Sequence, residues 1–140
     1  MFIPQNYKYK KTFRPRVDKR SKSFSKMSNF CYGSFGFKAI STGWISSIHL
    51  IAIRKIVSKH LKRSGGFCFK IFPNFTVTKK PLEVRMGKGK GNVDSWVFPI
   101  KTGVIFLEFK EITLQKAEEL FDLCKVRLPI KIKLIKNDCN

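Results

Sequence analysis

The chain has 140 residues and a formal net charge of +20 at pH 7, from 29 Lys and Arg against 9 Asp and Glu. Hydrophobic residues make up 43% of the sequence, which is enough for one domain with a real core and excludes a disordered tail. Because so large a charge repels itself, it favours a dense polyanion as partner, and nucleic acid is denser in charge than an anionic membrane.

The charge is unevenly distributed along the chain. Residues 1–63 carry 15 basic and 1 acidic side chains, residues 64–92 carry 6 and 1, and residues 93–140 carry 8 and 7. We therefore expect the first two thirds of the chain to meet the polyanion. No segment approaches the ~18 apolar residues of a transmembrane helix, and the N-terminal residues lack the apolar region of a signal peptide.

Residues 4–29 are predicted to form an extended basic arm, because Pro15 interrupts any helix. Aromatic residues alternate with its cations, and these are Tyr7, Tyr9, Phe13 and Phe24. Cations neutralise phosphates, and aromatic rings stack on exposed bases. We predict that residues 1–29 are an extension that becomes ordered on nucleic acid and that residues 30–140 form a single domain. A disordered, solubilising N-terminus is the alternative.

The next segments predict a strand and then a helix. Residues 32–40 alternate aromatic and small residues, as a strand does, with close backbone approach at Gly33 and Gly36. The helix begins at Ser46 or Ser47 and runs to about Lys62. Its apolar stripe consists of Leu50, Ile53, Ile56, Val57 and Leu61. The opposite face presents the cations Arg54, Lys55, Lys59, Lys62 and Arg63.

Further strands and a second helix follow. Residues 67–72 have little polar character and are expected to be buried on both faces or paired under the helix. Residues 93–100, 104–109 and 130–135 also predict strands. The second helix runs from Thr113 to about Val126. Its predicted buried stripe is Leu114, Ala117, Leu120, Phe121 and Cys124. Its outward acids, Glu118, Glu119 and Asp122, would repel RNA, so we expect this helix to lie away from the polyanion.

Residues 85–91, Arg-Met-Gly-Lys-Gly-Lys-Gly, alternate cations with glycines and connect a hairpin-like pair of segments. The glycines leave the backbone free, so the segment predicts a thin cationic tip whose side chains and N–H groups can approach phosphates. A solvated hairpin loop is the alternative. A Walker-type phosphate loop is excluded, because it needs Ser or Thr after Gly-Lys and then a helix, whereas Lys90 is followed by Gly-Asn and a strand.

The sequence indicates no catalytic site, metal, cofactor or small-molecule substrate. Cys31, Cys68, Cys124 and Cys139 form no Cys-x-x-Cys pair. The two histidines are eleven residues apart on one helix, ~16 Å by helical rise, which is too far for a shared metal and indicates boundary residues. The few carboxylates form no general acid and base pair.

The loop and its flanks resemble the L-sixteen family of large-subunit ribosomal proteins in its bacterial and organellar form. Lys80-Pro81-Leu82, the run Val-Arg-Met-Gly-Lys-Gly-Lys-Gly-Asn at 84–92 and Trp96-Val97 correspond to the central signature of that family. Residues 32–39, Phe72-Pro73 and residues 128–131 also match in order, so the resemblance runs from Met1 to about Leu134.

The resemblance implies an α+β fold, with two helices on a mixed, mainly antiparallel sheet, docked on large-subunit rRNA near the A site and beside other ribosomal proteins. It implies that the loop points toward the peptidyl transferase centre and the acceptor ends of tRNA. The residues that we expect at the loop are Arg85, Met86, Gly87, Lys88, Gly89, Lys90 and Gly91. Those expected on rRNA are Lys8, Lys10, Lys11, Arg14, Arg16, Lys38, Arg54, Lys55, Lys59, Lys62 and Arg63.

The chain also departs from the family pattern. Gln5-Asn6 stands where Lys-Arg is usual, and Asn74-Phe75-Thr76 stands where Asp-Lys-Pro is usual. The arm begins at Met1 in the family register, so no transit peptide is expected. Heavy use of Phe, Ile, Lys, Ser and Asn is typical of an AT-rich genome and predicts a protein made inside an organelle, a mitochondrion before a plastid, with a reduced bacterium as a further alternative. A free-standing RNA chaperone or regulator is the alternative function, and sedimentation with large subunits would distinguish the two.

Overall fold

The computed structural model describes residues 2–13, 17, 25–62 and 65–137. Along the chain its elements are α1 (Ser25–Ser28), β1 (Phe35–Ala39), β2 (Gly43–Ser46), α2 (Ser47–Leu61), β3 (Gly66–Phe69), β4 (Phe75–Lys79), β5 (Asn92–Ile100), β6 (Ile105–Lys110), α3 (Leu114–Lys125) and β7 (Ile132–Lys136). The predicted α+β class is confirmed.

The strands form two antiparallel sheets where a single mixed sheet was expected. One sheet has the order β3-β6-β1-β7 and the other has the order β2-β5-β4. The chain leaves the first sheet at the turn after β1, where the N–H groups of Ile40 and Ser41 donate to the carbonyl of Lys131. The chain then enters β2, which pairs with β5 and not with β1.

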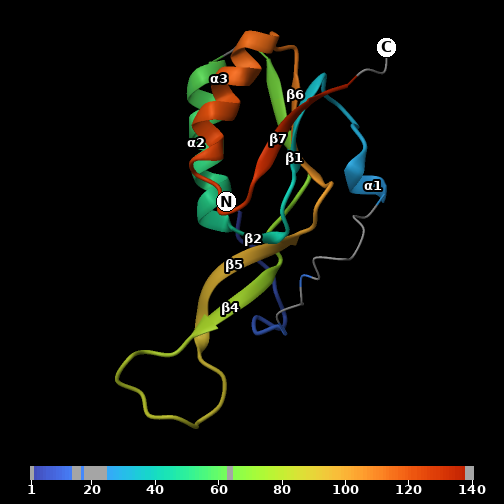
Figure 1. Cartoon of the computed structure of the whole chain (residues 1–140). Coiled ribbons are helices and arrows are strands. Elements are labelled where there is room, and N and C mark those ends of the chain that lie inside the picture. Colours follow the sequence, from blue (N-terminus) through green and yellow to red (C-terminus); the bar gives the residue numbers. More distant parts are fainter. Residues whose placement is uncertain (1, 14–16, 18–24, 63–64, 138–140) are drawn as a thin grey trace.

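The core lies between the four-stranded sheet and the two long helices, which pack side by side along it (Figure 1). Phe37 of β1 is fully buried and makes edge-on ring contacts with Phe109 of β6, at 4.9 Å, and with Phe121 of α3, at 5.8 Å. Leu50 and Ile53 of α2 are also fully buried. Burial of these apolar side chains is the main term that holds helices and sheet together.

Helix α2 closely follows its prediction. Leu50, Ile53, Val57 and Leu61 are buried as expected, whereas Ile56 is only half-buried.

Gly33 and Gly36 also confirm the predicted close approach of β1, because a Cβ atom at Gly33 would lie 2.3 Å from the carbonyl oxygen of Phe109, and one at Gly36 would lie 2.8 Å from the ring of Phe30.

Three predictions about elements are wrong. Strand β3 is an edge strand of the four-stranded sheet, so Cys68 is exposed and the expected burial on both faces is wrong. The alternative of a paired strand agrees with the structure, because β3 pairs with β6 and its Phe67 and Phe69 pack against the core. Residues 25–28 form a helical turn inside the arm that was expected to be extended. Leu114 begins α3 at the rim of the core and is 53% exposed, because the buried stripe of that helix is Ala117, Leu120 and Cys124.

The β4–β5 hairpin projects from the domain, and its connecting loop lies at the far end of the molecule from α3 (Figure 1). Strand β5 pairs with β2 through its C-terminal half and with β4 through its N-terminal half. The last paired residues before the loop are Lys79 and Asn92. The three-stranded sheet therefore acts as a stalk that holds residues 80–91 away from the core.

Candidate nucleic-acid interface

The loop at the end of the hairpin exposes almost all of its side chains. Residues 81–90 are all exposed, and Leu82 and Met86 are exposed to 98% and 101%. The predicted cationic tip is thus present as a projecting loop. Clusters of large, solvent-exposed apolar side chains are unusual in a free protein, and they indicate a surface that a partner covers.

The loop backbone explains its alternation of glycine and lysine. Gly87, Lys88 and Gly89 all have positive φ, at 97°, 56° and 77°. Glycine adopts this region freely, whereas for Lys88 a left-handed conformation costs roughly 1–2 kcal/mol. At Gly91 the requirement is steric, because an added Cβ would lie 2.6 Å from the carbonyl oxygen of Lys79. Glycines therefore let a narrow loop turn back on itself.

The cations of the loop fall into two groups. The ammonium groups of Lys80 and Lys90 donate to backbone carbonyls, those of Gly87 and Thr12 respectively. Within the described part of the chain, the side chains of Arg85 and Lys88 make no hydrogen bond or ion pair, and both are exposed. Arg85 and Lys88 are therefore available to an anionic partner.

The described part of the N-terminal arm lies against the hairpin. The ring of Tyr7 packs edge-on against Trp96 of β5 at 5.4 Å, and its hydroxyl donates to the carbonyl of Asn74. Lys8 and Lys10 are exposed, while the ammonium group of Lys11 donates to the loop carbonyl of Lys90. Arg14 and Arg16, which were also expected on RNA, lie outside the described residues.

The remaining predicted cations lie on two different surfaces. Lys55, Lys59 and Lys62 are exposed on the outer face of α2 or directly after it. Half-buried Arg54 lines a hollow of about 450 Å³ that it shares with Phe2. Arg63 lies outside the described residues. Lys38 is in β1 next to Phe37, and because Phe37 faces the helices, Lys38 lies on the other face of the sheet.

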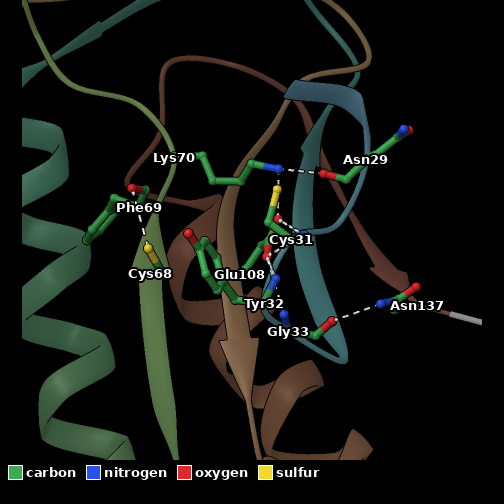
Figure 2. Close-up of polar contacts among 9 residues, drawn as sticks. All are labelled: Asn29, Cys31, Tyr32, Gly33, Cys68, Phe69, Lys70, Glu108 and Asn137. Carbon is green, nitrogen blue, oxygen red and sulfur yellow. Dashed lines mark hydrogen bonds and ion pairs between the residues drawn. The ribbon is translucent and has the colours of Figure 1, made fainter. Parts of the chain in front are cut away.

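A buried carboxylate, which was not singled out in the sequence, fastens the chain where the arm enters the domain (Figure 2). Glu108 of β6 has a side chain with no exposed surface. Its oxygens accept the backbone N–H groups of Cys31, Tyr32 and Gly33, at 2.7–3.3 Å. The Lys70 ammonium lies 2.9 Å from Glu108 Oε1 and also donates to the carbonyl of Asn29. The sequence signal that could have identified this residue is the position of an acid inside the apolar run of residues 104–109.

The surroundings of Glu108 keep the pair ionised. Burial on its own raises the pKa of this carboxyl, but the hydrogen bonds from Lys70 and from the N–H groups of Tyr32 and Cys31 outweigh burial, and the pKa is lowered. Burial likewise lowers the pKa of Lys70, but the hydrogen bonds to Glu108 and Cys31, together with the nearby negative charge, outweigh burial, so that pKa is raised. Because both charges are satisfied within the fold, this site is structural.

Other kinds of site find no support in the described residues. No group of three or more His, Cys, Asp or Glu among them is placed to hold a metal ion. Burial raises the pKa of the Cys124 thiol to about 12, which leaves it protonated and unreactive. None of the described helices is long and apolar enough to cross a membrane.

A basic α+β domain with a projecting cationic loop is typical of a ribosomal protein, and comparison with known proteins identifies the family. The family described as Ribosomal protein L16p/L10e matches residues 4–135. The large ribosomal subunit protein uL16c of Cyanidium caldarium is 38% identical over 138 residues, which cover 99% of this chain and 96% of that protein. The large ribosomal subunit protein uL16 of Staphylococcus carnosus (strain TM300) is 39% identical over 139 residues, which cover 99% of this chain and 94% of that protein. The chain belongs to the Ribosomal protein L16p/L10e family.

Membership confirms the resemblance noted in the sequence and its extent over almost the whole chain. The family consists of ribosomal structural proteins and is not known as a family of enzymes, so the chain is a ribosomal structural protein. The matched relatives include bacterial proteins and the uL16c of Cyanidium caldarium. They agree with the alternatives of a plastid or a bacterium.

Proposed function

We propose that this protein binds large-subunit rRNA through its basic surfaces and that residues 80–91 help to position the acceptor ends of tRNA near the A site and the peptidyl transferase centre. The chain is a structural constituent of the large ribosomal subunit, as its family implies. The finer assignment, to tRNA, rests on the loop.

One observation carries that assignment, namely the projecting loop with two available cations and two fully exposed apolar side chains. Arg85 and Lys88 supply charge for phosphate, and Leu82 and Met86 supply apolar surface for sugars and bases. The stalk of β4 and β5 holds these groups beyond the rest of the domain (Figure 1). Such a loop suits entry into a crowded RNA pocket better than contact with a flat surface.

The rRNA contacts are assigned to the arm, to the outer face of α2 and to Lys38. Lys55, Lys59 and Lys62 form a row of exposed cations along one side of the domain. Glu118 and Glu119 are exposed on α3, and their negative charge supports a position for that helix away from the phosphates.

The test removes the two available loop cations together. In particles that carry Arg85→Ala with Lys88→Ala, we expect aminoacyl-tRNA to bind the A site more weakly by on the order of tenfold, about 1.4 kcal/mol, since two phosphate contacts are lost. The thermal midpoint of the free protein should stay within about a degree, because exposed substitutions change stability little. Normal tRNA binding in particles that contain the variant would show that the loop does not act on tRNA.

We further propose that the protein works in a mitochondrial ribosome. The support is compositional, since 14 Phe and a preponderance of Lys over Arg are typical of an AT-rich organellar genome. A plastid or a reduced bacterium would leave a similar composition, and cell fractionation distinguishes the three.

A further inference from the structure

We infer that the N-terminal arm is a clamp that holds the tRNA-proximal loop in position and that Lys90 is a positioning residue of this clamp, not a phosphate contact. The inference deepens the proposed function and rests on it for the role of the loop in tRNA binding. The clamp itself is a property of the free protein.

The first part of the clamp is a pair of threonines. The N–H of Thr12 donates to Thr76 Oγ1 at 3.1 Å, and the N–H of Thr76 donates to Thr12 Oγ1 at 3.2 Å. The two hydroxyl oxygens are themselves 3.2 Å apart. Thr76 lies in β4 and is only 2% exposed, so the arm covers it. Reciprocal bonds of this kind fix the register of the arm along the hairpin.

The second part is the contact of Tyr7 with Trp96 and Asn74, five residues earlier along the arm. Aromatic pairs with this edge-on geometry contribute about 0.5–1.5 kcal/mol beyond the area that they bury. Since Trp96 is in register with Thr76, the ring of Tyr7 and the side chain of Thr12 contact the same level of the stalk. The arm is thus attached at two points before it reaches the loop.

The third part joins the arm directly to the loop. The Lys90 ammonium donates to the carbonyl of Thr12 at 2.7 Å and lies 5.3 Å from the ring centre of Phe13. In return the Lys11 ammonium donates to the carbonyl of Lys90 at 3.1 Å. These reciprocal bonds connect the returning limb of the loop to the arm, and they engage the Lys90 ammonium in an intramolecular contact at the surface.

A loop with three glycines needs such a fastening. Each glycine increases the conformational entropy that is lost when the loop becomes ordered on a partner. Lys90 lies next to Gly91, at the point where the loop closes on Lys79. A bond from Lys90 to the arm therefore restricts the base of the loop, while Lys88, two residues away at the tip, remains free. Alternate lysines of one motif thus have different roles.

The first measurement tests the clamp in the free, full-length protein. Backbone 15N order parameters are compared for wild type, Thr12→Val, Lys90→Ala and Lys88→Ala. Thr78→Val is the matched threonine substitution, on β4, the strand that Thr12 contacts. We expect the order parameters of residues 87–91 to fall below about 0.6 in Thr12→Val and Lys90→Ala and to stay at wild-type values in the other two. Unchanged values in Thr12→Val and Lys90→Ala would refute the clamp.

The second measurement separates positioning from phosphate contact. The salt dependence of A-site tRNA binding is measured on particles that contain Lys88→Ala or Lys90→Ala. Lys88→Ala should reduce the slope of log K against log salt by about 0.7–0.9, because one phosphate contact is lost. Lys90→Ala should weaken binding several-fold at each salt concentration and leave the slope unchanged. An equal reduction of slope in both variants would assign Lys90 to phosphate and overturn its positioning role.

The two measurements also separate this inference from the function on which it rests. If the order parameters fall as expected but neither variant affects tRNA binding, the clamp stands as a structural device and the proposed role of the loop fails. If Lys88→Ala weakens tRNA binding and the order parameters do not change in Lys90→Ala, the role of the loop stands and the clamp fails.

Discussion

At the scale of single residues, the main finding is that not every cation of this chain is available to RNA. Lys70 neutralises Glu108, and Lys90 donates to the arm, although both belong to segments of high positive charge. Glu108 stabilises the junction between the arm and the domain, since it accepts three consecutive backbone N–H groups and pairs with one ammonium group. Charge count alone cannot separate binding cations from structural ones.

Removal of Lys70 should therefore destabilise the domain strongly. In Lys70→Met the carboxylate of Glu108 stays buried without its cation, and we expect the free energy of unfolding to fall by about 3–5 kcal/mol. Lys110→Met is the matched control, because Lys110 pairs with Glu111 at the surface, where such pairs contribute about 0–1 kcal/mol. Urea denaturation of both variants measures the difference. Losses of equal size would contradict a structural role of the buried pair.

At the scale of elements, α2 begins with a capping box in which a histidine takes the place of the usual Glu or Gln. Ser46 Oγ accepts the N–H of His49, and His49 Nδ1 accepts the N–H of Ser46 at 3.2 Å. The acceptor role requires a neutral ring, and burial lowers the pKa of His49 in agreement with that role. His49 was expected as a boundary residue, and it is indeed half-buried; its part in the helix start is an additional role.

This cap predicts a pH dependence of stability. Because the folded-state pKa of His49 lies below its ordinary value of 6.5, the unfolded chain binds more protons in the range between the two pKa values. The contribution of His49 to the free energy of unfolding should thus be fully present above about pH 6.5, and the free energy of unfolding should decrease as the pH falls below that value.

The variant His49→Gln isolates this contribution. Glutamine keeps the acceptor of the capping box but does not titrate, so the decrease between about pH 6.5 and pH 5 should be smaller than in wild type. Thermal melts of wild type and variant at half-unit pH intervals measure the difference. Identical pH profiles would show that His49 does not contribute to the pH dependence.

At the scale of the whole molecule, the domain carries its charges on different sides. Lys55 and Lys59 extend along α2, whereas α3 exposes Glu118, Glu119 and Asp122. The two helices pack side by side on the same sheet (Figure 1). The outer surface of α2 is basic, whereas that of α3 is mixed, because it also exposes Lys116 and Lys125. The orientation of the domain on rRNA should follow from this difference.

Paired substitutions test that orientation. For binding to large subunits that lack this protein, Lys55→Gln with Lys59→Gln should reduce the slope of log K against log salt by roughly 1.8, which corresponds to two phosphate contacts. Lys116→Gln with Lys125→Gln on α3 removes the same charge and should leave the slope nearly unchanged. Equal reductions by the two pairs would mean that net charge, not the α2 face, determines binding.

Local pattern was sufficient for much of the fold. The 3.6-residue periodicity of residues 47–61 predicted α2 and most of its buried side, and the Gly-Lys run predicted a projecting loop. Strand β3 was misjudged because its residues have the composition of a central strand, while its edge position depends on which strand pairs with it. Its burial is thus not a local property.

The class of fold, the surplus of positive charge, the family and the loop at residues 80–91 could be read from the amino-acid sequence, because each of these depends on composition, periodicity or a continuous motif. Which cations remain available became clear only from the contacts of the folded chain. The partners of Lys90 and Lys70 are 78 and 38 residues away, at Thr12 and Glu108. Contacts between segments so distant in the chain leave no periodic signal in the sequence. They form only when the arm packs on the hairpin and when β6 brings Glu108 next to Lys70.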